Sequence, residues 1–177
     1  MSYLVNPYMV TAPVVPMVCY NDGSLNTYYE YRSTTDSNFV LGAYIDTGAN
    51  PVYNKAVTSI STFLYADSTL SGGVFALGVW DENGNLRNES SDFTVADMPV
   101  GTSPANPTEK ITRSIDETTI ALRDSIGIIC KTAPTGSGDV ANGGYDGTFS
   151  AWKRSAFIQG DSFTATANRV LVICVNE

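Results

Sequence analysis

The sequence predicts an all-β fold: an antiparallel β-sandwich of jelly-roll type with an extended N-terminal arm. Short runs of β-branched, aromatic and other apolar residues recur along the chain. Clusters of Gly, Asn, Asp and Pro separate these runs and predict turns. No stretch of helix length has apolar residues repeating every 3.6 positions. Eight runs fit the strand pattern: Tyr28–Arg32, Phe39–Ile45, Thr58–Tyr65, Val74–Trp80, Asp92–Val95, Ile111–Ile115, Ser125–Cys130 and Arg169–Val175.

The length of 177 residues predicts one folded unit, divided into an arm over residues 1–24 and a sandwich over residues 25–177. Pro7, Pro13 and Pro16 exclude a helix in the arm and remove backbone donors. The arm is too apolar to lie in water, so we expect it to lie on its own domain or on a neighbouring subunit. Its candidate assembly residues are Val14, Val15, Met17 and Val18.

Period-two alternation assigns the faces of the predicted strands. It places Phe39, Leu41, Ala43 and Ile45 on one face, and Phe75, Leu77 and Val79 on a face opposite Ala76, Gly78 and Trp80. The runs 126–130 and 169–175 are apolar on both faces, which indicates cover on both sides. We expect the arm or another subunit to supply the second cover.

Two segments between the runs carry clear turn or loop signals. Asn83-Gly84 between two runs predicts a hairpin whose second strand starts near Leu86. Ala133 to Tyr145 contains four glycines and one proline, which predicts a long loop of the kind that binds ligands.

Composition excludes several classes of function. The net charge of −8 disfavours binding to a phosphate backbone. The sequence has no histidine, which excludes Ser-His-Asp and Cys-His catalysis and most transition-metal sites. We therefore expect no enzymatic activity and no catalytic residues. Neither a secretory signal nor a membrane span is evident, so we expect assembly in a cytoplasm.

The three cysteines, Cys19, Cys130 and Cys174, lack the close spacing of zinc or redox motifs. Two interpretations remain open. The cysteines are buried free thiols that act as small apolar residues, or Cys130 and Cys174 form a bridge between neighbouring strands.

Calcium is the one cofactor for which the sequence offers a pattern. Asp81, Asn83 and Asn85 present oxygen atoms at alternate positions around a glycine, as calcium loops do. Asp92 stands at the twelfth position in place of glutamate, and an ordinary hairpin turn explains the same residues. Asp139, Asn142 and Asp146 form a second candidate, for which a solvated loop is the alternative.

Aromatic residues are candidates for binding a glycan or a subunit, because exposed rings stack on sugars and anchor interfaces. The alternative is that a sandwich places large β-forming residues on both faces. The candidate ligand-binding residues are Tyr145, Trp152, Lys153 and Arg154, with Trp152 favoured because it follows the predicted loop and precedes two cations. Further aromatic candidates are Tyr28, Tyr44, Tyr53, Tyr65 and Trp80.

One stretch resembles a known group of domains. Residues 54–65 read NKAVTSISTFLY and residues 71–85 read SGGVFALGVWDENGN. This is similar to the K-x-x-T-S … V-W-D-x-x-G pattern of jelly-roll β-sandwich modules in archaeal and bacterial surface proteins and in virion proteins. Residues 124–128 and 145–148 extend the resemblance, which covers about residues 39–177. It implies a displayed or assembled structural domain that often binds glycans or other subunits, and it specifies no ligand.

Three functions follow as hypotheses. The first is a virion structural protein, such as a capsid, decoration or fibre-type subunit, that assembles with itself and with other virion proteins. The second is a carbohydrate-binding or receptor-binding module. The third is a calcium-dependent adhesion domain.

Overall fold

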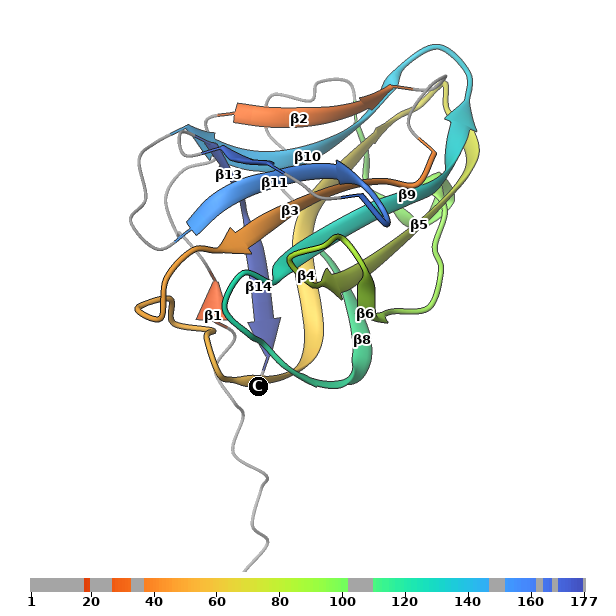
Figure 1. The fold of residues 1–177 in the computed structure, drawn as a ribbon. Helices are drawn as coiled ribbons and strands as arrows, with labels where there is room; N and C mark the ends of the chain where they lie inside the picture. Colours follow the sequence, from red (N-terminus) through yellow and green to blue (C-terminus); the bar gives the residue numbers. More distant parts are fainter. Residues whose placement is uncertain are drawn as a thin grey trace, which may run out of the picture.

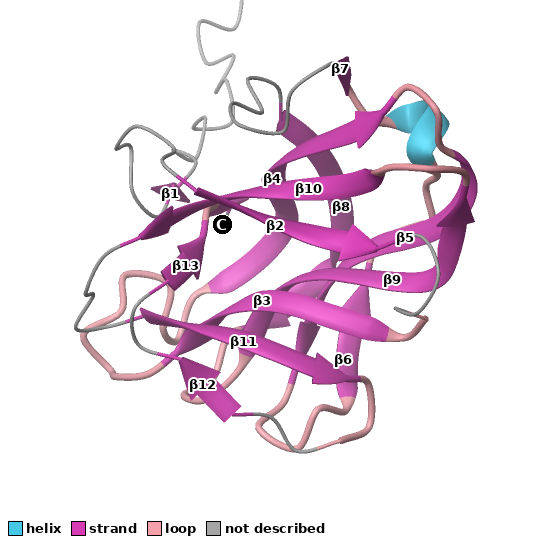
Figure 2. Cartoon of the chain, turned by 90° about the horizontal axis from the view of Figure 1, so that it is seen from above, coloured by secondary structure: helices cyan, strands magenta, loops and turns pink. Residues whose placement is uncertain are grey.

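The computed structural model describes residues 18–19, 27–32, 37–101, 110–146, 152–161, 164–166 and 169–176. Within these residues, the strands form two sheets that pack face to face, and the one helix described is a short 3-10 helix (Figures 1 and 2). The predicted all-β sandwich is therefore confirmed, whereas its jelly-roll connectivity stays a prediction.

One sheet has six strands, and every neighbouring pair in it is antiparallel. Its order is β12-β11-β3-β9-β5-β6. The bounds of β3 are those of the predicted run. The six strands are β3 (Phe39–Ile45), β5 (Ser71–Trp80), β6 (Leu86–Glu89), β9 (Ser125–Thr135), β11 (Trp152–Ile158) and β12 (Thr164–Thr166).

The other sheet has eight strands arranged around β4, which pairs with β14, β8, β10 and β7. The pairing of β4 with β7 is parallel and the other pairings in this sheet are antiparallel. The eight strands are β1 (Val18–Cys19), β2 (Thr27–Arg32), β4 (Ala56–Asp67), β7 (Val100–Gly101), β8 (Lys110–Thr119), β10 (Asp139–Asp146), β13 (Arg169–Leu171) and β14 (Ile173–Asn176).

The main hydrophobic core lies between the sheets and follows the predicted alternation. Leu41, Ala43 and Ile45 of β3 face it, as do Leu77 and Val79 of β5. Burying a side chain of this size contributes roughly 1.5–3 kcal/mol. The core is completed by Val57, Ile60, Leu64, Phe75, Ile111, Ile115, Ile120, Ile126, Ile128, Ile173 and Val175, among others.

Two of the sequence expectations about segments are wrong. Residues 133–145 are not a long loop, because β9 continues to Thr135 and β10 begins at Asp139. The glycine-rich β10 is held as a strand by pairing with β2, β4 and β13. The run Asp92–Val95 is not a strand either: Phe93 forms one isolated bridge with Phe75, and the 3-10 helix Val95–Asp97 follows.

Most of the N-terminal arm lies outside the described residues, including the predicted assembly residues Val14, Val15 and Met17. Val18 and Cys19 form β1, which pairs with β14 of the same chain. This short part of the arm therefore lies on its own domain and not on a neighbouring subunit.

The proposed Cys130–Cys174 bridge is wrong. Cys130 on β9 is a buried thiol that is not in a disulfide, whereas Cys174 on β14 is disulfide-bonded. β9 and β14 belong to different sheets, so the two residues are not on neighbouring strands. The free-thiol interpretation holds for Cys130 and fails for Cys174.

Candidate interaction surface

A second hydrophobic cluster lies on the face of the six-stranded sheet that points away from the main core. It contains Val40, Ala76, Trp80, Ile129 and Phe157. Trp80, one of the aromatic candidates for an exposed binding residue, is fully buried in this cluster. Its indole meets the Phe157 ring edge-on, with ring centroids 6.3 Å apart.

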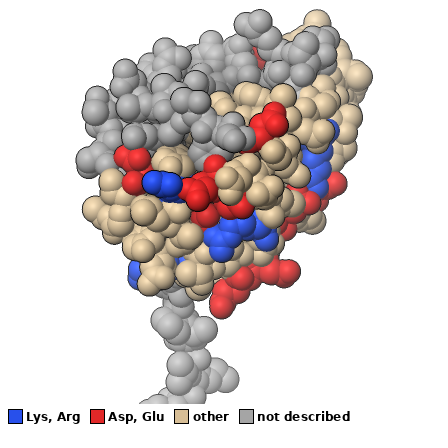
Figure 3. All heavy atoms as spheres, viewed as in Figure 1, with Lys and Arg blue, Asp and Glu red and all other residues tan. Residues whose placement is uncertain are grey.

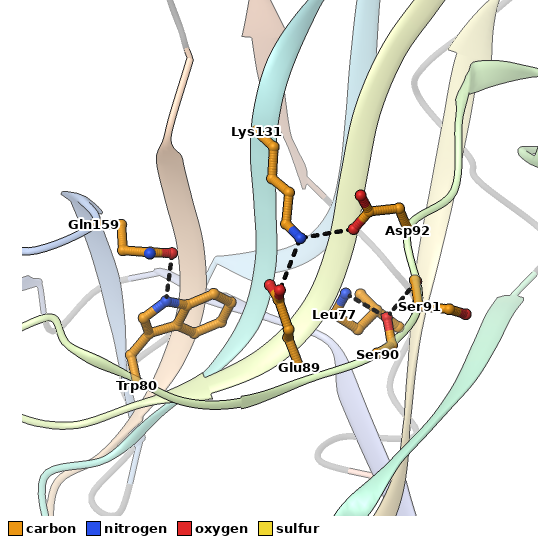
Figure 4. Close-up of polar contacts among 8 residues, drawn as sticks. All are labelled: Leu77, Trp80, Glu89, Ser90, Ser91, Asp92, Lys131 and Gln159. Carbon is orange, nitrogen blue, oxygen red and sulfur yellow. Dashed lines mark hydrogen bonds and ion pairs between the residues drawn. The ribbon is translucent and has the colours of Figure 1, made fainter.

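Gly78 makes room for this indole. A Cβ placed on Gly78 would lie 3.0 Å from a ring carbon of Trp80. The tryptophan Nε1 donates to the Gln159 side-chain oxygen at 3.3 Å, which joins β5 to the turn after β11 (Figure 4).

The second face of β9 is therefore covered from within the chain. Ile129 is buried beneath this cluster, and on β14 Cys174 is also fully buried in the single chain. Ile129 is buried within the single chain, so another subunit is not needed to cover it. Residues 1–17 of the arm lie outside the described part, and cover by the arm stays a prediction.

A charged cluster lies beside the buried indole. The Lys131 ammonium contacts Glu89 Oε1 at 2.8 Å and Asp92 Oδ1 at 2.6 Å (Figure 4). Burial alone would lower the pKa of Lys131, but the hydrogen bonds to Asp92 and Glu89 outweigh it and raise the pKa. Lys131 is therefore a paired cation that fastens β9 to β6, and it is not poised to lose its proton.

The hairpin predicted at Asn83-Gly84 is confirmed, and its second strand begins at Leu86. Asp81 Oδ1 accepts hydrogen bonds from the backbone N–H groups of Asn83 and Asn85, at 2.8 and 2.9 Å. Asp81 Oδ2 accepts one from the Asn85 side-chain amide at 3.1 Å. The carboxylate that calcium would need is thus engaged by its own turn, as the hairpin interpretation expects.

The other calcium candidate does not form a loop. Asp139, Asn142 and Asp146 all lie on β10. At about 3.3 Å per residue, the ends of this set are roughly 23 Å apart along the strand. Within the described part of the chain, no three acidic, cysteine or histidine side chains gather as metal ligands would.

Three exposed apolar side chains lie on or beside segments that are joined to the turn at residues 120–124. Tyr53, Leu86 and Leu122 are 40%, 37% and 45% exposed. The segment of Tyr53 is tied to this turn by the hydrogen bond from Asn54 N to Ile120 O, 2.8 Å long. We call Tyr53, Leu86 and Leu122 the turn surface.

Ion pairs hold the segments of the turn surface together. Arg87, next to Leu86, pairs with the buried carboxylate of Asp124, and the exposed Arg123 pairs with Glu82 at 2.9 Å. Burial raises the pKa of Asp124, opposed by the N–H of Ala121 and by Arg87. On the face drawn in Figure 3, acidic and basic side chains lie side by side. Protein interfaces have an apolar centre and a polar rim.

The sequence identified this surface only in part. Tyr53 was among the aromatic candidates, whereas Leu86 and Leu122 were not candidates at all. A usable signal was the sequence Leu122-Arg123-Asp124, in which a large apolar residue stands in a charged turn. Arg123 has a φ of 70°, so a tight turn projects Leu122 outward.

The predicted ligand-binding residues fall on two different sheets. Tyr145 is on β10 of the eight-stranded sheet, and Trp152, Lys153 and Arg154 are on β11 of the six-stranded sheet. Trp152 pairs with Ile45, so it begins a strand and does not follow a long loop. The side chains of these four residues lie outside the described part, and their role stays a prediction.

No helix in the described part of the chain is long and apolar enough to cross a membrane. Comparison with protein families, with curated proteins and with solved structures finds no match to this chain. The interpretation of the turn surface therefore depends on its own geometry.

Proposed function

We propose that this chain is a non-enzymatic structural protein of a virus particle: a capsid, decoration or fibre-type subunit. It associates with copies of itself and with other particle proteins, through its sandwich and its N-terminal segment, in the host cytoplasm. The jelly-roll connectivity of such subunits is part of this proposal.

The observation that carries the proposal is the turn surface. Large apolar side chains exposed in the described residues are Tyr53, Leu86, Leu122 and Ile158, and three of these four lie on segments joined at the 120–124 turn. Single exposed apolar residues are ordinary, whereas a contiguous apolar patch marks a contact site, and the proposal takes these three residues as part of one patch. The ion pairs Arg87–Asp124 and Arg123–Glu82 hold the surrounding backbone in place. Little conformational entropy is therefore lost when this surface associates.

A pair of charge substitutions tests the turn surface. Leu122→Asp should weaken self-association at least tenfold, because it places an unpaired carboxylate in the contact. Ile158→Asp is the matched control, because Ile158 is 51% exposed but lies away from the turn surface. Ile158 pairs with Phe39 at one end of β3, whereas the 120–124 turn is bonded to the other end, where the Ile45 carbonyl accepts from Arg123 N. Size-exclusion chromatography with light scattering gives the mass of each variant. Equal weakening by both substitutions would contradict the turn surface.

The contribution of the arm requires a separate variant. Deleting residues 1–17 leaves β1 on β14, so the sandwich should stay folded. We expect this deletion to reduce the assembled fraction while the melting temperature changes little. An unchanged assembled fraction would remove the arm from the proposal.

The carbohydrate-binding alternative stays a prediction, since no contact among the described residues favours it. Trp80 is buried and offers no platform for a sugar. A glycan array with Trp152→Ala as the comparison decides the matter: reproducible hits that this substitution removes would support the alternative.

A further inference from the structure

The state of the three cysteines leaves one unassigned. Cys174 is disulfide-bonded, and Cys130 is not in a disulfide. The sequence contains only one other cysteine, Cys19. β1 and β14 are antiparallel, and their register places Cys19 directly opposite Cys174. Opposed residues in antiparallel strands have Cα atoms about 4.5–5.5 Å apart, which lies within the span of a disulfide.

We propose that Cys19 is the partner of Cys174, and that their disulfide is a covalent clamp that fixes the N-terminal segment to the C-terminal strand. β1 has two residues and pairs only with β14 among the described strands. The hydrogen bonds of so short a strand contribute little net stability. β14, in contrast, is anchored by Ile173 and Val175 in the main core. The disulfide therefore ties a weakly held element to a firmly held one.

The clamp has two physical consequences. It closes a loop that includes nearly the whole chain, and long loops lose the most entropy in the unfolded state. It also keeps β1 on the outer edge of β14, which would otherwise present unpaired backbone groups to other chains.

The bond forms by exchange with a small disulfide such as oxidised glutathione. One cysteine thiolate attacks the glutathione disulfide, which gives a mixed disulfide and releases one glutathione. The second cysteine thiolate attacks the protein-bound sulfur, which closes the clamp and releases the second glutathione. The cytoplasm keeps thiols reduced, so the clamp closes after the protein leaves it. This timing depends on the proposed function, whereas the pairing does not.

Thiol counting on the full chain tests the pairing. The protein is incubated with oxidised glutathione, denatured without reductant, and labelled with a maleimide. Mass spectrometry should find one labelled thiol, at Cys130, and three after reduction. A protease digest should give one cross-linked peptide pair that contains Cys19 and Cys174. Three labelled thiols before reduction, a cross-link through Cys130, or a covalent dimer on a non-reducing gel would overturn the proposal.

Two variants separate the clamp from a general effect of cysteine loss. Cys19→Ser should leave two labelled thiols and lower the melting temperature of the oxidised protein by roughly 10 °C. Cys130→Ser is the matched control: it should leave no labelled thiol, and its melting temperature should still fall on reduction. An oxidised Cys174 or an unchanged melting temperature in Cys19→Ser would overturn the clamp.

Sedimentation of the same samples tests the proposed function independently. A monomer that contains the Cys19–Cys174 disulfide contradicts assembly but not the clamp. An assembled protein with three free thiols contradicts the clamp but not assembly.

Discussion

At the scale of single residues, Trp80 shows how a sheet covers its own outer face. The sequence alternation correctly placed Trp80 opposite Phe75, Leu77 and Val79. It could not show that the ring lies against Gly78 and meets Phe157 and Gln159, because those two residues are far away in the sequence. To predict whether an outward-facing aromatic residue is exposed, one must therefore know its neighbours across the sheet.

Trp80→Ala should lower the free energy of unfolding by about 3–5 kcal/mol, because it removes a fully buried aromatic side chain and leaves a cavity beside Phe157. Tyr53→Ala, at a position 40% exposed, should cost much less. Urea unfolding followed by circular dichroism measures both. Similar losses for the two variants would show that Trp80 is not part of a packed cluster.

Several carboxylates in turns should make the stability of the folded protein depend on pH. The pKa of Asp67 is lowered by the N–H and hydroxyl of Thr69, and that of Asp97 by those of Thr94. Burial acts to raise the pKa of Asp81, but hydrogen bonds from Asn85 and Asn83 lower it overall. Each contributes stability that is present above the unfolded pKa, about 3.9, and lost as the pH falls through the folded value.

Asp124 acts in the opposite direction. Its pKa is raised by burial, so its contribution is complete below about pH 3.9 and is lost as the pH rises through the folded value. We expect a net loss of thermal stability below about pH 4, since the pKa is lowered for the carboxylates of Asp67, Asp81 and Asp97 and raised only for that of Asp124. Asp81→Asn should reduce the difference in melting temperature between pH 7 and pH 3, and Glu117→Gln, on the exposed β8 surface, should not. An undiminished difference in Asp81→Asn would contradict this account.

At the scale of elements, the β5–β6 hairpin and the turn after β11 close over the second cluster together. Gly160 N donates to Gly84 O at 2.9 Å, and Gln159 accepts from Trp80. The hairpin itself was predictable from Asn83-Gly84. Its contact with residues 159–161 was not, because it joins segments far apart in the sequence.

Two glycine substitutions test this closure. Gly84 has a φ of 78°, and a Cβ there would lie 2.2 Å from the Asp161 carbonyl oxygen. Gly160 has a φ of 91°, but a Cβ there would meet nothing within 4 Å. Gly84→Ala should therefore cost clearly more than the roughly 1 kcal/mol of left-handed strain expected for Gly160→Ala. Equal losses in chemical denaturation would mean that the hairpin tip is not packed.

β10 shows where sequence patterns fail for an element. Asn142, Gly143 and Gly144 are typical of loops. In the structure they pair with β2, and β4 and β13 also pair with β10, so tertiary pairing overrides local preference. The reverse holds for Asp92–Val95, where β-branched and aromatic residues lack a continuous partner strand and form a bridge and a 3-10 helix instead.

At the scale of the whole molecule, strands that are apolar on both faces suggested cover by the arm or by another subunit. Residues 125–130 of β9 and 173–175 of β14 are buried in the single chain, so no second subunit is needed to cover them. The case for assembly now depends on the turn surface, which became visible only when the 46–55 and 120–124 turns and β6 were brought together. The fold class followed from alternation and turns, which are local, whereas the surface depends on long-range contacts.

Sedimentation velocity of the full chain over a hundredfold range of concentration tests self-assembly most directly. The account predicts species well above the 18.9 kDa of one chain, with a share that rises with concentration and falls in Leu122→Asp. A single species of 18.9 kDa at every concentration would contradict it.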